Sequence, residues 1–356
     1  MTTRVLLLGA TGAVGSACLD ALAADPEVTI TLAGRDPAAH RALRAPGVRV
    51  AEQRLDLAAI STDGARLLDL AKRADVVVNC AGPSHRLSRS VAAVVMLCGA
   101  AYVDPGLNRA TMERIRRHMP HDAVAVVQTG VQPGLSGLAV RGLAEFLGGA
   151  DRVRAWCGGL QPLTAAAVAE YLAEAADGRS AVLRDHTPIR VRPSEIGDPP
   201  RAIFPPSARG HAHLDDEIVA VAERFAIPDL EWFNVTDHPA IERALGRLDG
   251  DASAAVERIR AAAHLDLFGR DPYFTLFARA DRGDEHAAYL LNARDSYAVT
   301  GAITAWAART ATTAPPGLHP LWSLPRAAEL TARLRLVPGL RITLEAGEPD
   351  HDRGSL

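Results

Sequence analysis

Cysteine is scarce in this sequence and long apolar runs are missing, and each absence excludes a class of protein. The four cysteines are scattered, without Cys-x-x-Cys spacing, which indicates a reduced protein without disulfides. No run of about 18 apolar residues is free of charge, so no transmembrane helix is expected. The apolar run over residues 1–8 is too short for a signal peptide. We therefore expect a cytoplasmic protein.

An excess of charge of one sign is also lacking. The chain has 39 basic and 42 acidic residues and a formal net charge of −3, which gives no reason to expect a nucleic-acid or membrane partner. Lys72 is the only lysine, so the basic residues are nearly all arginine. Together with abundant alanine, this suggests a GC-rich coding sequence rather than a function. A length of 356 residues is sufficient for two globular domains.

The N-terminus contains a strand, a glycine-rich turn and a helix in succession. Val5–Leu8 are all apolar, as in a strand buried on both faces, and Ala17–Ala23 has helical apolar spacing. Gly9 permits the tight turn, Gly12 lets a pyrophosphate approach, and Gly15 lets the helix pack closely. The context predicts a dinucleotide site, and a purely structural turn is the alternative. The predicted cofactor contacts in this turn are Gly9, Thr11, Gly12, Ala13, Val14 and Gly15.

The residue after the second strand indicates which dinucleotide is bound. NAD sites usually place an acidic residue at the end of this strand, to hold the ribose 2′-hydroxyl. Here Val28–Ala33 ends at Gly34, and Arg35 follows. A guanidinium suits a 2′-phosphate, so we expect NADPH or NADP rather than NAD. A solvated loop arginine is the alternative, and Asp36 is expected to cap the next helix.

Six apolar strands alternate with helices in the first part of the chain, which predicts a doubly wound parallel sheet of the Rossmann type. The loops after the fourth and sixth strands lie at the carboxyl edge, where such folds bind ligands. Asp56 ends the third strand and is more often the cap of a helix around Gly64–Lys72 than an adenine contact. The further predicted cofactor contacts are Asp56, Cys80, Ala81, Gly82, Pro83 and Gly130.

The character of the chain changes after Gly148-Gly149. Alternating strands and amphipathic helices predict a second, α+β domain for substrate binding and dimerisation. We expect an NADP-binding domain over 1–135, this second domain over 136–292, helices returning to the first domain over 293–345, and a disordered tail over 346–356.

The order of the motifs resembles the saccharopine dehydrogenase-like oxidoreductases, in the short form with one Rossmann domain. The motifs that carry this resemblance are Gly9–Gly15, Ala33–Asp36, Val78–Pro83, Tyr102–Asp104 and Gly130–Ser136, with weaker likeness at Cys157–Leu160 and Asp295–Thr300. The resemblance implies an NADP-dependent enzyme that transfers a hydride to or from a C–N bond, such as an imine derived from an amino acid. Such an enzyme holds the imine carbon against the nicotinamide and handles a proton at nitrogen.

Three side chains are candidates for that proton chemistry. Asp104 matches the family's acid at the sheet edge, where a carboxylate can hold or protonate an imine nitrogen. A helix cap or a supporting hydrogen bond is the alternative role for Asp104. His85 is a candidate proton donor, although an exposed histidine is the commoner reading. Tyr171 is a candidate acid or anchor, with simple packing as its alternative.

Four residues are candidate substrate contacts, and the sequence departs from the family pattern in two places. The candidate contacts are Ser84, Gln132, Pro133 and Gly134. Ser84 and His85 stand where the family often has an aromatic residue, and Gln132 stands where many members have Asp. These departures favour a secondary-metabolic imine over saccharopine itself.

Three functions remain open from the sequence. The leading one is an NADPH-dependent imine reductase, and the others are a trans-acting enoyl reductase and a non-catalytic NADPH-binding sensor or scaffold. We expect a small-molecule substrate, free or tethered to a carrier protein, and a homodimer. The histidine groups at 211–216 and 118–121 lack metal-ligand spacing and are expected to be solvated loops, so no metal is expected.

Overall fold

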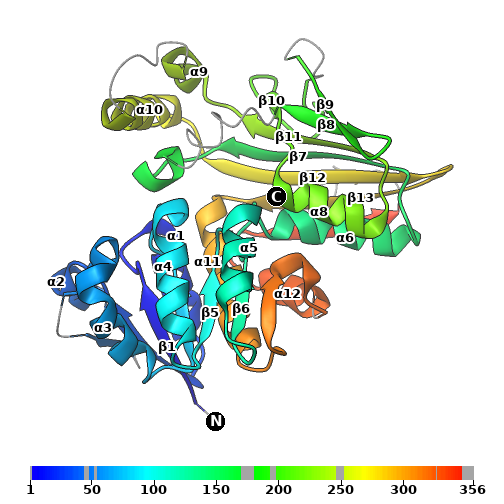
Figure 1. Ribbon diagram of the computed structural model, residues 1–356. Helices are drawn as coiled ribbons and strands as arrows, with labels where there is room; N and C mark the ends of the chain where they lie inside the picture. Colours follow the sequence, from blue (N-terminus) through cyan, green and yellow to red (C-terminus); the bar gives the residue numbers. More distant parts are fainter. Residues whose placement is uncertain are drawn as a thin grey trace. The chain divides into compact units, whose positions relative to one another are not determined.

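The computed structural model describes residues 2–43, 48–51, 54–169, 180–192, 198–245, 252–325 and 327–346. The chain divides into two compact units. Unit 1 comprises Met1–Leu135 and Tyr297–Val337, and unit 2 comprises Ser136–Ser296 and Pro338–Leu356. Each unit is built around its own β-sheet (Figure 1).

Within the described residues, unit 1 forms a seven-stranded parallel sheet with the order β14-β6-β5-β4-β1-β2-β3. The strands are β1 (Thr3–Leu8), β2 (Val28–Ala33), β3 (Val48–Val50), β4 (Val76–Asn79), β5 (Ala101–Asp104), β6 (Val124–Val127) and β14 (Gly317–Pro320). The chain moves outward from β1 in one direction and then from β4 in the other, so the order reverses between these two strands. This confirms the predicted doubly wound sheet, and it makes the carboxyl ends of β1 and β4 the expected ligand crevice.

Helices accompany this sheet because its strands are apolar on both faces. They are α1 (Ala13–Ala23), α2 (Pro37–Ala42), α3 (Ile60–Ala71), α4 (Ser84–Met96), α5 (Arg109–His118), α11 (Ser296–Ala311) and α12 (Ala327–Leu334), with short 3₁₀ turns η1 (Leu57–Ala59) and η3 (Leu321–Ser323). Leu6 and Leu8 belong to one core cluster with residues of α3, α4 and α5. The alternate residues Val5 and Leu7 are also fully buried, as expected for a parallel sheet covered on both sides.

Unit 2 contains a mixed sheet with the order β15-β13-β12-β7-β11-β8-β9, and β10 pairs with β11. Its strands are β7 (Arg152–Leu160), β8 (Ala181–Arg184), β9 (Thr187–Arg190), β10 (Arg209–Ala212), β11 (Asp229–Thr236), β12 (Tyr273–Arg282), β13 (Glu285–Ala293) and β15 (Arg341–Ala346). Only β7 and β11 pair in parallel among the described strands of this sheet. The helices of this part are α6 (Leu135–Leu147), α8 (Asp216–Phe225), α9 (Pro239–Leu245) and α10 (Ala252–Leu267).

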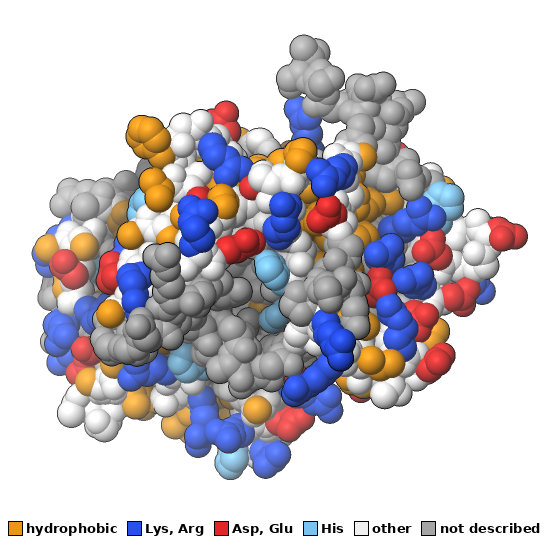
Figure 2. Space-filling view, turned by 90° about the horizontal axis from the view of Figure 1, so that it is seen from above, with side chains coloured by type: hydrophobic (Ala, Val, Ile, Leu, Met, Phe, Trp, Pro, Cys, Tyr) orange, Lys and Arg blue, Asp and Glu red, His pale blue; other side chains and the backbone are white. Residues whose placement is uncertain are grey.

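The surface of the protein mixes charges of both signs. Figure 2 shows basic and acidic side chains interspersed across the face in view, with apolar side chains in small groups. Exposed ion pairs also occur among the described residues, such as Arg109 with Glu113 at 3.1 Å. None of the described helices is long and apolar enough to span a membrane.

The prediction that residues 293–345 are helices is wrong for two short segments. Strand β14 adds to unit 1 in parallel beside β6, and β15 joins unit 2 in antiparallel pairing with β13. The reason is that a four-residue strand such as Gly317–Pro320 has too few residues to show a period of two. Strands β10 and β11 also went unpredicted. Ala346, the first residue of the predicted disordered tail, is the last residue of β15, so the prediction is wrong there. Residues 347–356 and Tyr171 lie outside the described residues.

Candidate dinucleotide site and the polar clusters

The turn between β1 and α1 needs glycine at two positions for steric reasons. Gly9 has a φ of +77°, and a Cβ there would lie 2.7 Å from the carbonyl carbon of Cys80. A Cβ on Gly15 would lie 2.1 Å from the carbonyl oxygen of Gly9. Both contacts are with backbone atoms, which cannot move aside as a flexible side chain can. The helix, the turn and the end of β4 are therefore packed as closely as glycine allows.

The start of α1 leaves its first amides available to a ligand. Gly12 is the N-cap and makes no side-chain cap hydrogen bond, and Thr11 and Gly12 are exposed. A Cβ on Gly12 would lie 3.3 Å from the Gly9 carbonyl oxygen, a tight contact but a much milder one than at Gly15. Internal packing therefore restricts this position less than Gly15, and its bare backbone fits the close approach of a phosphate. The free amides of Ala13 and Val14 suit the same anion.

Arg35 lies in the loop after β2, where the 2′-position of a dinucleotide ribose is bound in such folds. Its side chain is exposed, and no hydrogen bond or ion pair ties it to the part of the chain that the structure describes. The neighbouring Asp36 is committed to the fold, because its carboxylate accepts hydrogen bonds from the amides of Ala38 and Ala39 at the start of α2. The predicted cap is confirmed.

A buried polar cluster links the ends of β4 and β5. The Asp104 carboxylate is 1% exposed and accepts hydrogen bonds from Asn79 Nδ2 at 2.9 Å, the Tyr102 hydroxyl at 2.5 Å and the amide of Gly106 at 2.8 Å. Burial raises the pKa of Asp104, and these hydrogen bonds oppose that shift. Burial also raises the pKa of the Tyr102 hydroxyl. The cluster orients Asn79 and therefore the loop that follows it.

That loop carries several of the predicted cofactor contacts. Leu8 pairs with Asn79 in the β1–β4 register, so Cys80–Pro83 lies next to the glycine turn, at the point where the strand order reverses. The pKa of the Cys80 thiol is raised, first by its hydrogen bond with Cys18 and then by burial, so Cys80 lacks the character of a reactive thiolate. Ser84 and His85 begin α4, and His85 is exposed.

The loop after β6 is held by α11. The Thr129 hydroxyl lies 3.1 Å from that of Thr304, and the Val131 amide donates to Thr300 Oγ1. A Cβ on Gly134 would lie 2.2 Å from the Gln128 carbonyl oxygen, at a φ of +133°, so glycine is required there. Gln132 and Pro133 are partly exposed on this loop. The structure therefore brings the predicted residues of β1, β4 and β6 to one edge of the sheet of unit 1.

Asp56 lies farther along the same sheet and caps the structure that follows it. Its carboxylate accepts the Ala58 amide at the start of η1 and pairs with Arg54 Nη2 at 2.9 Å. Helix α3 begins at Ile60, earlier than the predicted Gly64. Asp56 therefore caps η1, which leads into α3, whereas the N-cap of α3 itself is Ala59, so the predicted cap is confirmed only for the turn before the helix. A contact of Asp56 with the adenine stays a prediction.

Unit 2 holds a second buried polar cluster that sequence reasoning missed. At the end of β11, Asp237 is fully buried and accepts hydrogen bonds from Arg270 and from the Tyr273 hydroxyl. Next to it, His238 Nε2 accepts the Gln161 amide at 3.1 Å, and burial lowers the pKa of His238. The sequence Asp-His-Pro directly after a strand is the one local feature that indicates this cluster. Its partners lie more than 30 residues away, which hid it.

The histidines around residue 211 are only partly as predicted. His211 on β10 is exposed and lies 3.8 Å from Glu242, whereas Asp215 is buried and caps α8 by accepting the Ile218 amide. The interpretation of the whole segment as a solvated loop is therefore wrong, because its acidic end supports a helix. Within the described residues, no group of three His, Cys, Asp or Glu side chains is arranged to hold a metal ion.

Comparisons with known proteins agree with this geometry. Residues 5–131 match the family model described as the saccharopine dehydrogenase NADP binding domain. Among solved structures, apo saccharopine dehydrogenase (L-Glu forming) from Saccharomyces cerevisiae is similar with a TM-score of 0.74 and 17% identity, over 97% of this chain and 100% of that chain. Dipicolinate-bound dihydrodipicolinate reductase from Paenisporosarcina sp. TG-14 has a TM-score of 0.42 and 11% identity, over 90% and 98%. A search among curated proteins gives no match.

Proposed function

We propose that this chain, whose residues 5–131 belong to the saccharopine dehydrogenase NADP-binding family, is an NADPH-dependent reductase of a C=N bond in an amino-acid-derived substrate. The observation that supports this most strongly is the convergence of three loops at the carboxyl edge of one parallel sheet. The glycine turn after β1 and the loop Cys80–Pro83 lie side by side where the strand order reverses, as in a doubly wound fold that binds a dinucleotide, and the loop Gly130–Gly134 follows β6 at the same carboxyl edge.

The likeness of the whole fold to yeast saccharopine dehydrogenase supports the choice of an imine. That enzyme is named as a saccharopine dehydrogenase that forms L-Glu. Gln132 stands where the resemblance to the family leads us to expect Asp, and we take this difference as support for a substrate other than saccharopine. Assays with free substrates and with substrates tethered to a carrier protein distinguish the two forms.

The reaction needs a hydride at carbon and a proton at nitrogen. NADPH, when bound, supplies the hydride. The amides at the start of α1 bind its pyrophosphate, and Arg35 binds its 2′-phosphate. Asp104 acts as a positioning residue, because both of its carboxylate oxygens already accept hydrogen bonds that hold Asn79 and the Gly106 loop. Within unit 1, the candidate donor of a proton to the imine nitrogen of the substrate is His85, which is exposed at the first turn of α4.

The test is NADPH oxidation with a panel of substrates. We expect turnover with cyclic imines or with imines formed from an amino acid and a keto acid, presented free and on a carrier protein. Turnover of activated enoyl compounds and of no imine would show that the reaction is the reduction of a C=C bond instead of a C=N bond. Tight NADPH binding without turnover on any arm would instead favour the sensor.

A His85→Gln variant tests the proton donor. We expect it to lower kcat at least tenfold, to leave the Kd for NADPH unchanged, and to remove one limb of the pH–rate profile. His118→Gln is the matched control, because His118 lies at the exposed end of α5 and caps its own helix through the Arg114 carbonyl oxygen. An unchanged pH profile in His85→Gln would assign the proton to another group.

A further inference from the structure

Strand β15 forms one edge of the unit 2 sheet. It pairs with β13 on one side, from Asn292 opposite Arg341 to Ala287 opposite Ala346, and no other described strand pairs with its second side. The amide and carbonyl groups of a free strand edge are a template for another strand. Protein edges are usually protected by proline, charged side chains or a bulge; this edge has no proline, its charged residues Arg341 and Glu345 are of opposite sign, and the β-forming residues Ile342 and Thr343 lie between them.

The sequence of this strand is complementary to itself when it is reversed. We propose that β15 pairs in antiparallel fashion with β15 of a second copy of this chain, around a two-fold axis at Thr343. In that register Arg341 lies opposite the partner's Glu345, and Ile342 lies opposite the partner's Leu344. Each pair occurs twice because the axis repeats it. Opposite charges and apolar pairs directly across a ladder both stabilise the pairing.

The faces of the sheet agree with this register. Ile342 and Leu344 lie opposite Leu291 and Tyr289 of β13 and share one face, whereas Arg341, Thr343 and Glu345 share the other. Leu344 is 38% exposed although it continues a buried apolar row. The partner's Ile342 would cover it. A two-fold axis at Ile342 would instead place Arg341 opposite the partner's Thr343. An axis at Leu344 would place Glu345 opposite the partner's Thr343. Either register would lose both ion pairs, so the charges specify the register with the axis at Thr343.

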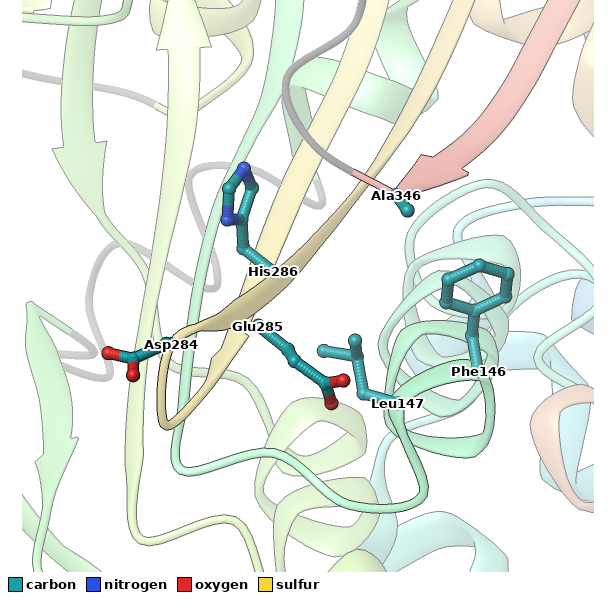
Figure 3. Close-up of a pocket in the computed structure, with 6 residues that line it drawn as sticks. All are labelled: Phe146, Leu147, Asp284, Glu285, His286 and Ala346. Carbon is teal, nitrogen blue, oxygen red and sulfur yellow. The ribbon is translucent and has the colours of Figure 1, made fainter.

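A pocket of about 480 Å³ lies at the C-terminal end of β15. It is lined by Phe146, Leu147, Asp284, Glu285, His286 and Ala346 (Figure 3). Phe146 is 51% exposed in the pocket wall. An antiparallel partner strand continues past Ala346, with the partner's Leu340 opposite that residue. The chain preceding the partner's strand therefore covers the exposed Phe146, which adds apolar contact to an edge that is short by itself.

Charge reversal tests the ion pairs. By sedimentation velocity, we expect the wild type to be a dimer. R341E and E345R each place like charges opposite one another twice, and we expect each to raise the dimer dissociation constant at least tenfold. The double variant R341E/E345R restores opposite charges, and we expect a constant within about threefold of the wild type. R117E on the exposed end of α5 is the control for net charge. Unchanged NADPH binding verifies folding in every variant.

Cross-linking tests the register. The two-fold axis places the two Thr343 Cβ atoms about 4.5–5.5 Å apart, close to disulfide reach. We expect T343C to form a covalent dimer with oxidised glutathione, and L344C, which faces the partner's Ile342, to form far less. A monomeric wild type, a dimer unaffected by R341E, or equal cross-linking of both cysteine variants would each overturn the proposal.

Discussion

At the scale of single residues, the buried carboxylates discussed above are bound by other protein groups, whereas the exposed Arg35 is not. Arg35 is exposed, and nothing in the described chain binds its guanidinium. Asp104 and Asp237 are buried, and each accepts hydrogen bonds from two or more groups. A buried carboxylate without such partners would cost several kcal/mol, so these two are committed to the fold. Arg35 remains available to a ligand.

Replacing Arg35 by alanine tests the preference for NADPH. We expect R35A to weaken NADPH at least tenfold, about 1.4 kcal/mol, and to change NADH binding less than twofold. The reason is that the guanidinium contacts only the 2′-phosphate, which NADH lacks. Titration calorimetry measures both constants, with R117A as the control for the loss of a surface arginine. Equal weakening of the two cofactors would contradict this assignment.

His238 makes the stability of unit 2 depend on pH. Burial lowers its pKa below the ordinary value of 6.5, and Nε2 must be unprotonated to accept the Gln161 amide. The unfolded chain therefore binds this proton at a higher pH than the folded chain does. Stability from His238 is complete above pH ~6.5 and is lost as the pH falls toward the folded pKa.

The variant H238Q isolates this effect, because glutamine also accepts a hydrogen bond but does not titrate. The free energy of unfolding of the wild type minus that of H238Q should fall by up to about 1.4 kcal/mol per pH unit below pH ~6.5. Urea unfolding at several pH values measures it. A difference that is constant with pH would show that His238 does not carry this linkage.

At the scale of elements, the glycines in the turn between β1 and α1 serve two different purposes, close packing and ligand binding. Gly15 is required by the packing of α1 on the turn, whereas a Cβ on Gly12 would make only one tight contact, at 3.3 Å from the Gly9 carbonyl oxygen. The same glycine motif thus contains one position that serves the fold and one that serves the phosphate.

Two alanine variants distinguish these roles. G15A should lower the free energy of unfolding by about 2 kcal/mol or more, because the new methyl group meets the Gly9 carbonyl oxygen. G12A should change stability by less than about 1 kcal/mol and still weaken NADPH at least tenfold, since the methyl group lies where the pyrophosphate approaches. Chemical denaturation and NADPH titration give the two quantities. Normal NADPH binding by G12A would refute this site for the phosphate.

At the scale of the whole molecule, the chain leaves unit 1 and returns to it. Helix α11 and strand β14 come from the last fifth of the sequence, yet they belong to unit 1, where β14 adds to the sheet that begins at Thr3. Gly301 of α11 lies against α1, where a Cβ would come within 2.5 Å of the Ala17 Cβ. The C-terminal segment therefore supports the helix whose amides are proposed to bind phosphate.

The variant G301A tests this support against a matched helical glycine. Alanine in a helix interior is ordinarily about 1 kcal/mol better than glycine, and G142A on α6 should show that gain because no atom lies within 4 Å of its Cβ. G301A should instead lose about 2 kcal/mol and weaken NADPH, because α1 must move. Equal stabilisation by both changes would show that α11 does not press on α1.

Local features of the sequence were enough to predict the Rossmann sheet, its cofactor and much of its edge. An apolar run, three glycines at fixed spacing and an arginine after the next strand act through neighbours in the chain. The same holds for the capping residues Asp36 and Asp56, whose hydrogen bonds reach only two or three residues. The resemblance to a family rested on these same segments.

The sequence by itself thus determined the fold class, the dinucleotide turn and the choice of NADP, because these depend on side-chain periodicity and short-range hydrogen bonds. Tertiary structure alone decided that β14 completes one sheet and β15 the other, that Asp104 is buried, and that Asp237 meets Arg270 and Tyr273. Strand partners and buried polar contacts join residues far apart in the chain, and which of them meet depends on how whole sheets and helices bury their apolar faces.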